Sequence, residues 1–168
     1  MTVREAPRVR NVVVGVDESP QSVAALRWAA GYAAITQAEL RLVHAFVLEP
    51  SEMYGSTAGL RDEIRRDAQS MLTELATAAL GSPPGAGSWR LDVVEGQPGP
   101  VLVERSQQAD LLVLGTREHT GVRRLMHGSV SHYCLSHAHG PVVAVPMSAL
   151  PPADEKSAEA GSRAGVSG

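Results

Sequence analysis

The sequence has few of the residues that build a covalent or metal-bound framework. Its 168 residues include a single cysteine, Cys134, which cannot form an internal disulfide and has no partner for a zinc site. A lone thiol is typical of a chain in a reducing interior. We therefore expect a cytoplasmic protein. Because Cys134 falls on the expected core side of a helix, it is favoured as an inert small hydrophobic residue over a redox sensor.

The sequence also lacks a long apolar run and an excess of positive charge. Residues 1–10 carry three arginines and no apolar stretch, so they do not resemble a signal peptide, and no later window reaches membrane-spanning length. The formal net charge is −3 and the pI is about 6.1, which gives no general attraction for polyanions. We expect neither a membrane nor a nucleic acid as a partner.

The length and the hydrophobic fraction of 43% suit one domain with its own core. We predict a flexible arm at 1–10 and a domain at 11–147. Residues 148–168 are rich in Ala, Gly, Ser, Pro and Glu, and they have too few large apolar side chains to offset the entropy of ordering. A disordered tail is expected there.

Short apolar runs alternate with helical patterns along the chain. This alternation indicates an α/β fold, a doubly wound parallel sheet with helices on both faces. In the first helix, apolar residues recur at helical spacing at Val23, Leu26, Ala30, Ala33 and Ala34. The strands are expected at Asn11–Asp17, Leu40–Phe46, Trp89–Val94, Asp110–Gly115 and Val142–Val145, and the helices at about Pro20–Ile35, Ala58–Leu80, Pro98–Gln107 and Ser129–His139.

Ligands of doubly wound sheets bind beyond the carboxyl ends of the strands, where the strand order reverses. The turn after the first strand is one candidate, with two interpretations. Asp17 accepts hydrogen bonds from a ribose or lies behind a metal, or Asp17 and Ser19 only cap the following helix. The residues favour neither interpretation over the other.

A second candidate runs from Gly115-Thr116-Arg117-Glu118 to Gly128-Ser129. Glycine at a strand end and at a helix start lets a phosphate approach the backbone, and the first helix amides with Ser129 and Ser131 supply donors. Any strand-loop-helix connection also needs a glycine and a cap, so this spacing alone decides little.

Four segments, VVVGVDES-P, ADLLVLGTR, HGSVS and GPVVAVP, resemble the universal stress protein family over residues 11–146. The resemblance implies a five-stranded, Rossmann-like sheet of strand order 3-2-1-4-5, related to the adenine nucleotide alpha hydrolases. It also implies an adenine nucleotide ligand: ATP, with AMP and cyclic AMP as alternatives and magnesium accompanying ATP. By this resemblance, Asp17 is expected to contact the ribose or a metal ion, and the Ala45 backbone is expected to contact adenine. The implied nucleotide-binding residues are Gly15, Asp17, Ser19, Ala45, Gly115, Thr116, Arg117, Gly128, Ser129, Val130 and Ser131.

The family's ATP-binding members share a G-2x-G-9x-G-[S/T] signature, and here Glu118 stands at its second glycine. Two functions therefore remain: a regulatory module that binds ATP in a stress response, or a universal stress protein that binds an unknown protein partner and no nucleotide. No nucleophile with a base and no paired carboxylates are visible, so we expect no enzyme, or at most slow ATP hydrolysis.

Five of the six histidines fall in the last third of the chain, and no pair has the helical spacing of a metal grip. We expect no metal site formed by side chains alone. His127 is a candidate phosphate contact, and His44 is expected as a hydrogen-bonded core or pocket-wall residue. The apolar strand Val142–Val145 is an expected edge, and we predict a homodimer through it.

Glu118→Gly is predicted to tighten ATP binding, because the carboxylate is expected within several ångströms of the triphosphate. Like charges about 5 Å apart repel by roughly 1 to 3 kcal/mol, partly offset by Arg117, so the gain in affinity is roughly three- to thirtyfold. Titration calorimetry in magnesium and in chelator measures it, and AMP is expected to gain less. Loss of affinity only with magnesium would make Glu118 a metal ligand, and equal affinities throughout would refute the repulsion.

Overall fold

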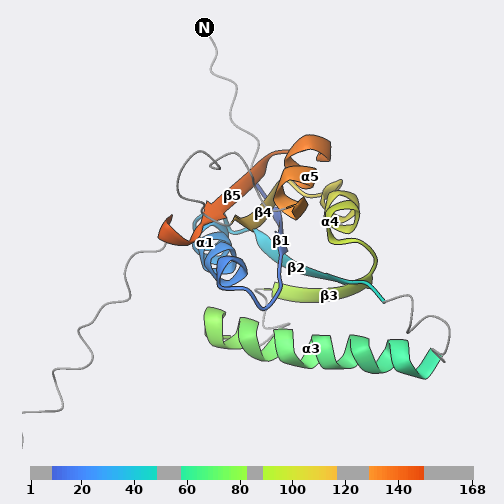
Figure 1. Ribbon diagram of the computed structural model, residues 1–168. Coiled ribbons are helices and arrows are strands. Elements are labelled where there is room, and N and C mark those ends of the chain that lie inside the picture. The colour runs from blue at the N-terminus through green and yellow to red at the C-terminus, as the bar shows by residue number, and fades with distance from the viewer. Residues whose placement is uncertain (1–8, 49–57, 83–88, 117–128, 150–168) are drawn as a thin grey trace, which may run out of the picture.

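The computed structural model describes residues 9–48, 58–82, 89–116 and 129–149 (Figure 1). Most of the expected arm and tail lies outside these ranges. Among the described residues, no helix combines the length and the apolar character that crossing a membrane requires.

Five parallel strands form one sheet in the order β3-β2-β1-β4-β5. This order and the parallel pairing confirm the predicted fold. The order reverses between β1 and β4, since β2 and β3 extend to one side and β5 to the other. The strands are β1 (Asn11–Gly15), β2 (Glu39–Phe46), β3 (Trp89–Glu95), β4 (Leu111–Thr116) and β5 (Val142–Pro146).

Two helices cover each face of the sheet (Figure 1). α1 (Pro20–Thr36) and α3 (Ala58–Leu80) pack on one face, and α4 (Pro98–Ser106) and α5 (Ser129–His137) on the other. A 3-10 turn at Met147–Ala149 follows β5. Right-handed crossovers from strand to strand produce this two-sided cover.

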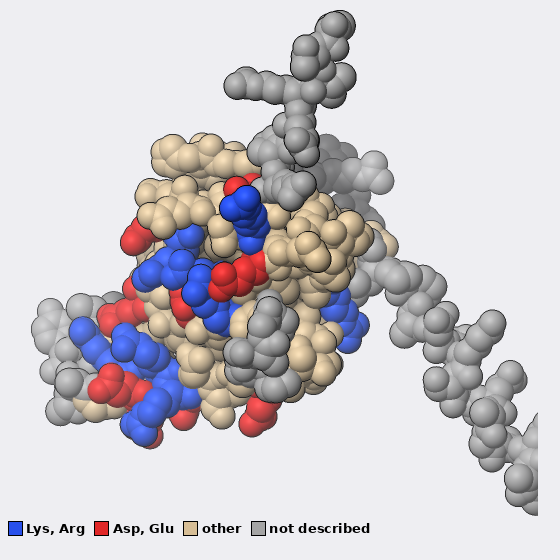
Figure 2. Space-filling view, turned by 180° about the vertical axis from the view of Figure 1, so that it is seen from behind, with Lys and Arg blue, Asp and Glu red and all other residues tan. Residues whose placement is uncertain are grey.

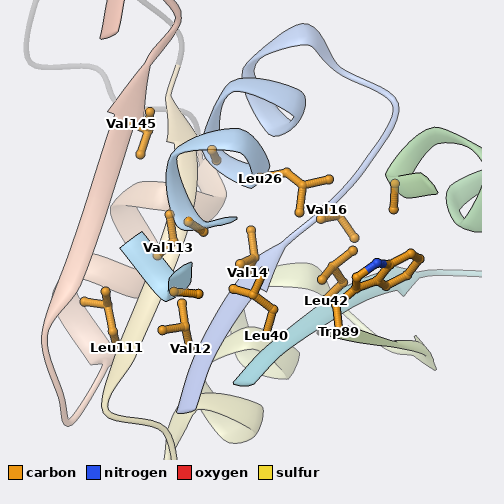
Figure 3. Close-up of a cluster of buried hydrophobic side chains, with 14 of the residues drawn as sticks. Val12, Val14, Val16, Leu26, Leu40, Leu42, Trp89, Leu111, Val113 and Val145 are labelled. Carbon is orange, nitrogen blue, oxygen red and sulfur yellow. The ribbon is translucent and has the colours of Figure 1, made fainter. Parts of the chain in front are cut away.

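The core consists of two layers because alternate residues of each buried strand face opposite sides. On the α1 side, Val12 and Val14 lie with Leu42 beneath Leu26 of α1, and each of these four is 0% exposed (Figure 3). Val13 belongs to the layer beneath α4 and α5. The continuous valine run therefore contributes to both layers.

Burial in the first helix only partly follows the apolar residues that recur at helical spacing in its sequence. Leu26 and Ala33 are buried as expected, but Ala34 is exposed, and Ala25 and Ala29 are buried instead. Alanine and glycine occur all around this helix, so its sequence has little apolar contrast from which to read a face.

The first strand is also shorter than predicted, ending at Gly15 rather than Asp17. The Val16 amide still donates to the Val43 carbonyl at 2.9 Å, but the Asp17 amide donates to Ser22 Oγ at 2.8 Å. The chain leaves the sheet here to cap α1.

At its start, β1 is joined to β4 by Asp110. Its Oδ2 accepts the amides of Arg10 at 2.8 Å and Asn11 at 2.9 Å. These two hydrogen bonds stabilise the ionised carboxylate and lower the pKa of Asp110. The Asp110 carboxylate therefore stabilises the fold at pH values above the pKa that it has in the unfolded chain. This stabilisation is lost as the pH falls through the lowered pKa of the folded state.

Gly115, near the end of β4, lies directly against the first turn of α1. A Cβ at this position would lie 2.4 Å from the Gln21 carbonyl oxygen and 2.9 Å from the Ser22 nitrogen. Both atoms belong to backbone, so no side-chain rotation relieves the clash. Glycine is required here by the packing of helix on strand.

Gly115→Ala is predicted to lower the free energy of unfolding by roughly 1–3 kcal/mol or more, because α1 has to shift away from β4. Gly31→Ala is the control, since a Cβ at Gly31 meets nothing within 4 Å. In this exposed helical position alanine stabilises by about 0.5–1 kcal/mol. Urea unfolding measures both variants, and parental stability of Gly115→Ala would contradict the packing argument.

Candidate functional site

A cavity of about 160 Å³ opens at the carboxyl ends of β1, β2 and β4. It lies where the strand order reverses, which is the expected ligand position in a doubly wound sheet. Helices α1, α4 and α5 also contribute residues to its wall. Seven of the predicted site residues line it: Gly15, Asp17, Ser19, Ala45, Gly115, Val130 and Ser131.

Three side chains organise the turn between β1 and α1. Asp17 Oδ1 accepts the Ser19 amide at 2.9 Å and the Ser19 hydroxyl at 2.5 Å. Ser19 Oγ in turn accepts the Ser22 amide at 3.2 Å, as an N-cap of α1. Asp17 and Ser19 therefore cap α1, and the ribose or metal role of Asp17 stays a prediction. These bonds use only Oδ1 of Asp17, and the residue is exposed at the cavity wall.

His44 lies on β2 in the cavity wall, as a hydrogen-bonded residue. Its Nδ1 is 2.9 Å from the Val16 carbonyl oxygen. A carbonyl oxygen only accepts, so Nδ1 carries the proton in this contact, and Nε2 of the neutral ring is left as an acceptor. The pocket-wall interpretation of His44 is confirmed.

The start of α5 forms the opposite side of the cavity. Val130 and Ser131 line it, and Ser131 is buried at 4% exposure. The first turn of a helix presents amide groups without intrahelical partners, and the helix dipole favours negative charge there. The wall therefore combines the first turns of α1 and α5 with the ends of three strands.

Four predicted residues are not among the described residues that line the cavity. Ser129 begins α5 and Thr116 ends β4, but neither lines the cavity. Arg117 and Gly128 lie outside the described residues, as do Glu118 and His127.

The sequence interpretation missed part of the wall on α4. Pro98 and Leu102 line the cavity beside Leu114 of β4, together with Val16, Ser22 and Val43. A Cβ on Gly15 would lie 2.8 Å from Leu114 Cδ2 and 3.1 Å from Leu102 Cδ1, so glycine keeps this wall open. The sequence predicted the helix at Pro98–Gln107, which contains Leu102. Its contact with the end of β1 depends on helix placement.

Cys134 of α5 lies beneath this layer and is 0% exposed. Its Sγ is 3.8 Å from the Gly99 carbonyl oxygen. Burial raises the pKa of the thiol to about 11, which keeps it protonated at neutral pH. Its predicted place on the core side is confirmed.

The site is polar on one side and apolar on the other. Asp17 is the one acidic residue among the described residues that line it. The described residues contain no cluster of three or more His, Cys, Asp or Glu that would bind a metal by themselves. The wall can therefore bind a ligand with an apolar ring, hydroxyls that donate to Asp17, and a negative group at the helix starts.

Relatives are found by sequence among mycobacterial proteins. A universal stress protein of Mycolicibacterium smegmatis (strain ATCC 700084 / mc(2)155) is 31% identical over 139 residues, covering 80% of this chain and 47% of that protein. One of Mycobacterium tuberculosis (strain ATCC 25618 / H37Rv) is 33% identical over 141 residues, covering 80% and 46%. The chain spans about half the length of these relatives.

Solved structures show the same fold. A universal stress protein in complex with cAMP superposes with a TM-score of 0.55 at 28% identity, over 84% of this chain and 99% of that one. A universal stress protein from Archaeoglobus fulgidus in complex with dAMP gives 0.55 at 20% identity, over 83% and 99%.

The family assignment follows from the match over most of the chain. A model of the universal stress protein family matches residues 8–146, which include the strands and helices described above. Together with the shared fold and the mycobacterial relatives, this match shows that the chain belongs to the universal stress protein family.

Proposed function

We propose that this chain is a regulatory module whose cavity at the carboxyl ends of β1, β2 and β4 binds an adenine nucleotide. ATP is the proposed ligand, with AMP and cyclic AMP as alternatives. The observation that carries the proposal is the position of the cavity at the reversal of strand order, between the first turns of α1 and α5. The relative in complex with cAMP supports an adenine nucleotide.

The wall suggests how each part of the nucleotide binds. The ribose hydroxyls donate to Asp17, whose Oδ2 is not used in the cap. The base lies against Ala45 and His44, where His44 Nε2 accepts from the 6-amino group of adenine. The phosphates lie toward the first turn of α5 at Val130 and Ser131.

Magnesium would enter with ATP rather than bind in advance. Magnesium is commonly held by one or two carboxylates together with substrate phosphates. Asp17 is the carboxylate that this wall offers.

The cavity volume lies below the ~300–1,000 Å³ of typical ligand pockets. Arg117 and Gly128, which the resemblance assigns to the same site, lie outside the described residues.

We propose that the protein acts by binding the nucleotide rather than by hydrolysing it, and that any hydrolysis is slow. Among the described wall residues, Ser19 is the hydroxyl bonded to a carboxylate. The same oxygen accepts the Ser22 amide, so it is committed to the helix cap rather than aimed at a substrate. His44 is bound to a backbone carbonyl and is not paired with a nucleophile there.

A larger side chain at Ala45 is predicted to block binding, because it occupies the proposed base position. Ala45→Leu is expected to weaken ATP and AMP binding at least tenfold in titration calorimetry. Ala78→Leu is the matched control, since Ala78 is a residue of α3 outside the wall, and its affinity is expected to stay within twofold. Parental affinity in Ala45→Leu would place the base elsewhere.

A second function is favoured by Glu118, which replaces a motif glycine with a carboxylate. In this case the domain binds a protein partner and no nucleotide. Nucleotide released from freshly purified protein by acid or heat separates the two functions. Its presence supports the module that binds nucleotide, and no measurable affinity for ATP, AMP or cyclic AMP supports the partner-binding protein.

We also propose a homodimer through β5. This strand ends the sheet next to β4, and its residues Val142–Ala144 are only half-buried. A half-buried apolar edge offers unpaired backbone groups to another chain. Leu112 donates to the Pro141 carbonyl, and alternate residues of a parallel ladder bond to the same neighbour. The backbone groups of Ala144 therefore face away from β4, toward the edge.

Ala144→Pro is predicted to convert the dimer to a monomer, because it removes an outward amide without removing a bond to β4. Ala144→Gly is the matched control: it keeps the amide and is expected to remain dimeric. Light scattering after size-exclusion chromatography gives the mass, and circular dichroism checks the fold. A dimeric proline variant would place the interface on another surface.

A further inference from the structure

A second cavity lies at the opposite, amino end of the sheet, on the side covered by α4. Its volume is about 130 Å³, and none of its wall residues belongs to the proposed nucleotide cavity. Three arginines from three different elements line it: Arg41 of β2, Arg90 of β3 and Arg105 of α4. Gln108 adds a neutral polar side chain and Glu39 the one carboxylate.

The register of β2 and β3 brings two of these arginines together. Arg41 and Arg90 are direct register partners, so both side chains leave the same face of the sheet. Like charges directly opposite on neighbouring strands are destabilising. Two acidic residues compensate: Arg41 Nε donates to Asp92 Oδ2 at 2.6 Å, and an Arg90 NH2 group lies 3.2 Å from Glu39 Oε1.

Arg105, in the last turn of α4, is not compensated in this way. Its Nε is buried and has no hydrogen-bond partner among the described residues. A buried donor without an acceptor destabilises the fold, most of all in a charged group, so such atoms are rare in folded proteins. Among the described residues, Arg105 is therefore the arginine of this wall whose charge no carboxylate pairs with.

The charge of the wall favours an anion as the ligand of this cavity. The cavity wall has three guanidinium groups and one carboxylate, and including Asp92 next to Arg41 still leaves one positive charge in excess. On the face shown in Figure 2, basic and acidic side chains lie side by side rather than in a field of one sign. The excess in the wall is a single positive charge, and a small ion suits it better than a long polyanion.

The cavity size points in the same direction. One water molecule occupies roughly 30 Å³ in the liquid, so the cavity has room for about four waters or one tetrahedral oxyanion. Guanidinium groups bind such ions through paired N–H donors, and several can share one ion with several oxygens.

We propose that this cavity binds a free inorganic oxyanion of the phosphate or sulfate type, with Arg105 as its central ligand. The ion accepts hydrogen bonds from the guanidinium groups of Arg105, Arg90 and Arg41, which line the cavity. Glu39 opposes the ion, but its charge is offset by Arg90. The site is independent of the proposed nucleotide site, because the two walls share no residue.

The test is a titration of the full chain with sodium phosphate at constant ionic strength, held by sodium chloride. The Arg105 Nε–H signal in ¹H–¹⁵N spectra is expected to shift in a saturable way. Arg105→Gln identifies this signal by its loss and is expected to weaken phosphate binding at least tenfold in calorimetry. Arg65→Gln is the matched control: it removes one charge from the exposed surface of α3 and is expected to stay within twofold.

Two further measurements test the geometry of the ion and the independence of the two cavities. Sulfate is expected to act like phosphate, and acetate is expected to bind more weakly; stronger binding of acetate would overturn the assignment to a tetrahedral ion. In Ala45→Leu the Arg105 signal is expected to shift with phosphate as it does in the parent. Loss of this shift would mean that the signal responds to phosphate bound in the nucleotide cavity. An Arg105 signal that does not move with phosphate would overturn the proposal.

Discussion

The backbone of α1 at Gln21 and Ser22 rests on the end of β4, at the one residue that leaves room for it. Gly115 permits this contact because it has no side chain. The contact fixes where α1 begins, and the beginning of α1 fixes the turn in which Asp17, Ser19 and Ser22 bond to one another. The polar side of the cavity therefore depends on a packing constraint between two elements that are far apart in the sequence.

The two ends of the sheet have opposite chemistry. At the carboxyl end, the wall offers backbone amides at helix starts, a carboxylate and a histidine bonded to a backbone carbonyl, among apolar side chains from α4 and β4. At the amino end, the wall is formed by ion pairs across β2 and β3 and by the last turn of α4. Parallel strands make this separation possible, because they bring all their starts to one edge and all their ends to the other.

Much of this arrangement could be predicted from local sequence. Ala58–Leu80 has the bounds predicted for it, and the Ser19-Pro20 cap starts its helix as expected, because local hydrogen bonds and periodicity determine these features. The inward face of α1 could not be predicted, because its small residues give no hydrophobic contrast between the sides of the helix. The pairing of Arg41 with Arg90 was also hidden, because it depends on the register between two strands that a long helix separates.

Both tryptophans lie on the α1 side of the sheet, Trp89 in the buried layer and Trp28 partly buried and stacked on Tyr32 at 5.4 Å. Trp89 also donates its indole N–H to the Ser82 carbonyl at the end of α3. Neither ring lines the nucleotide cavity or the arginine cavity. Intrinsic fluorescence is consequently a selective optical reporter: it follows the docking of α1 and α3 on the sheet, while ligand occupancy of either cavity requires a different probe.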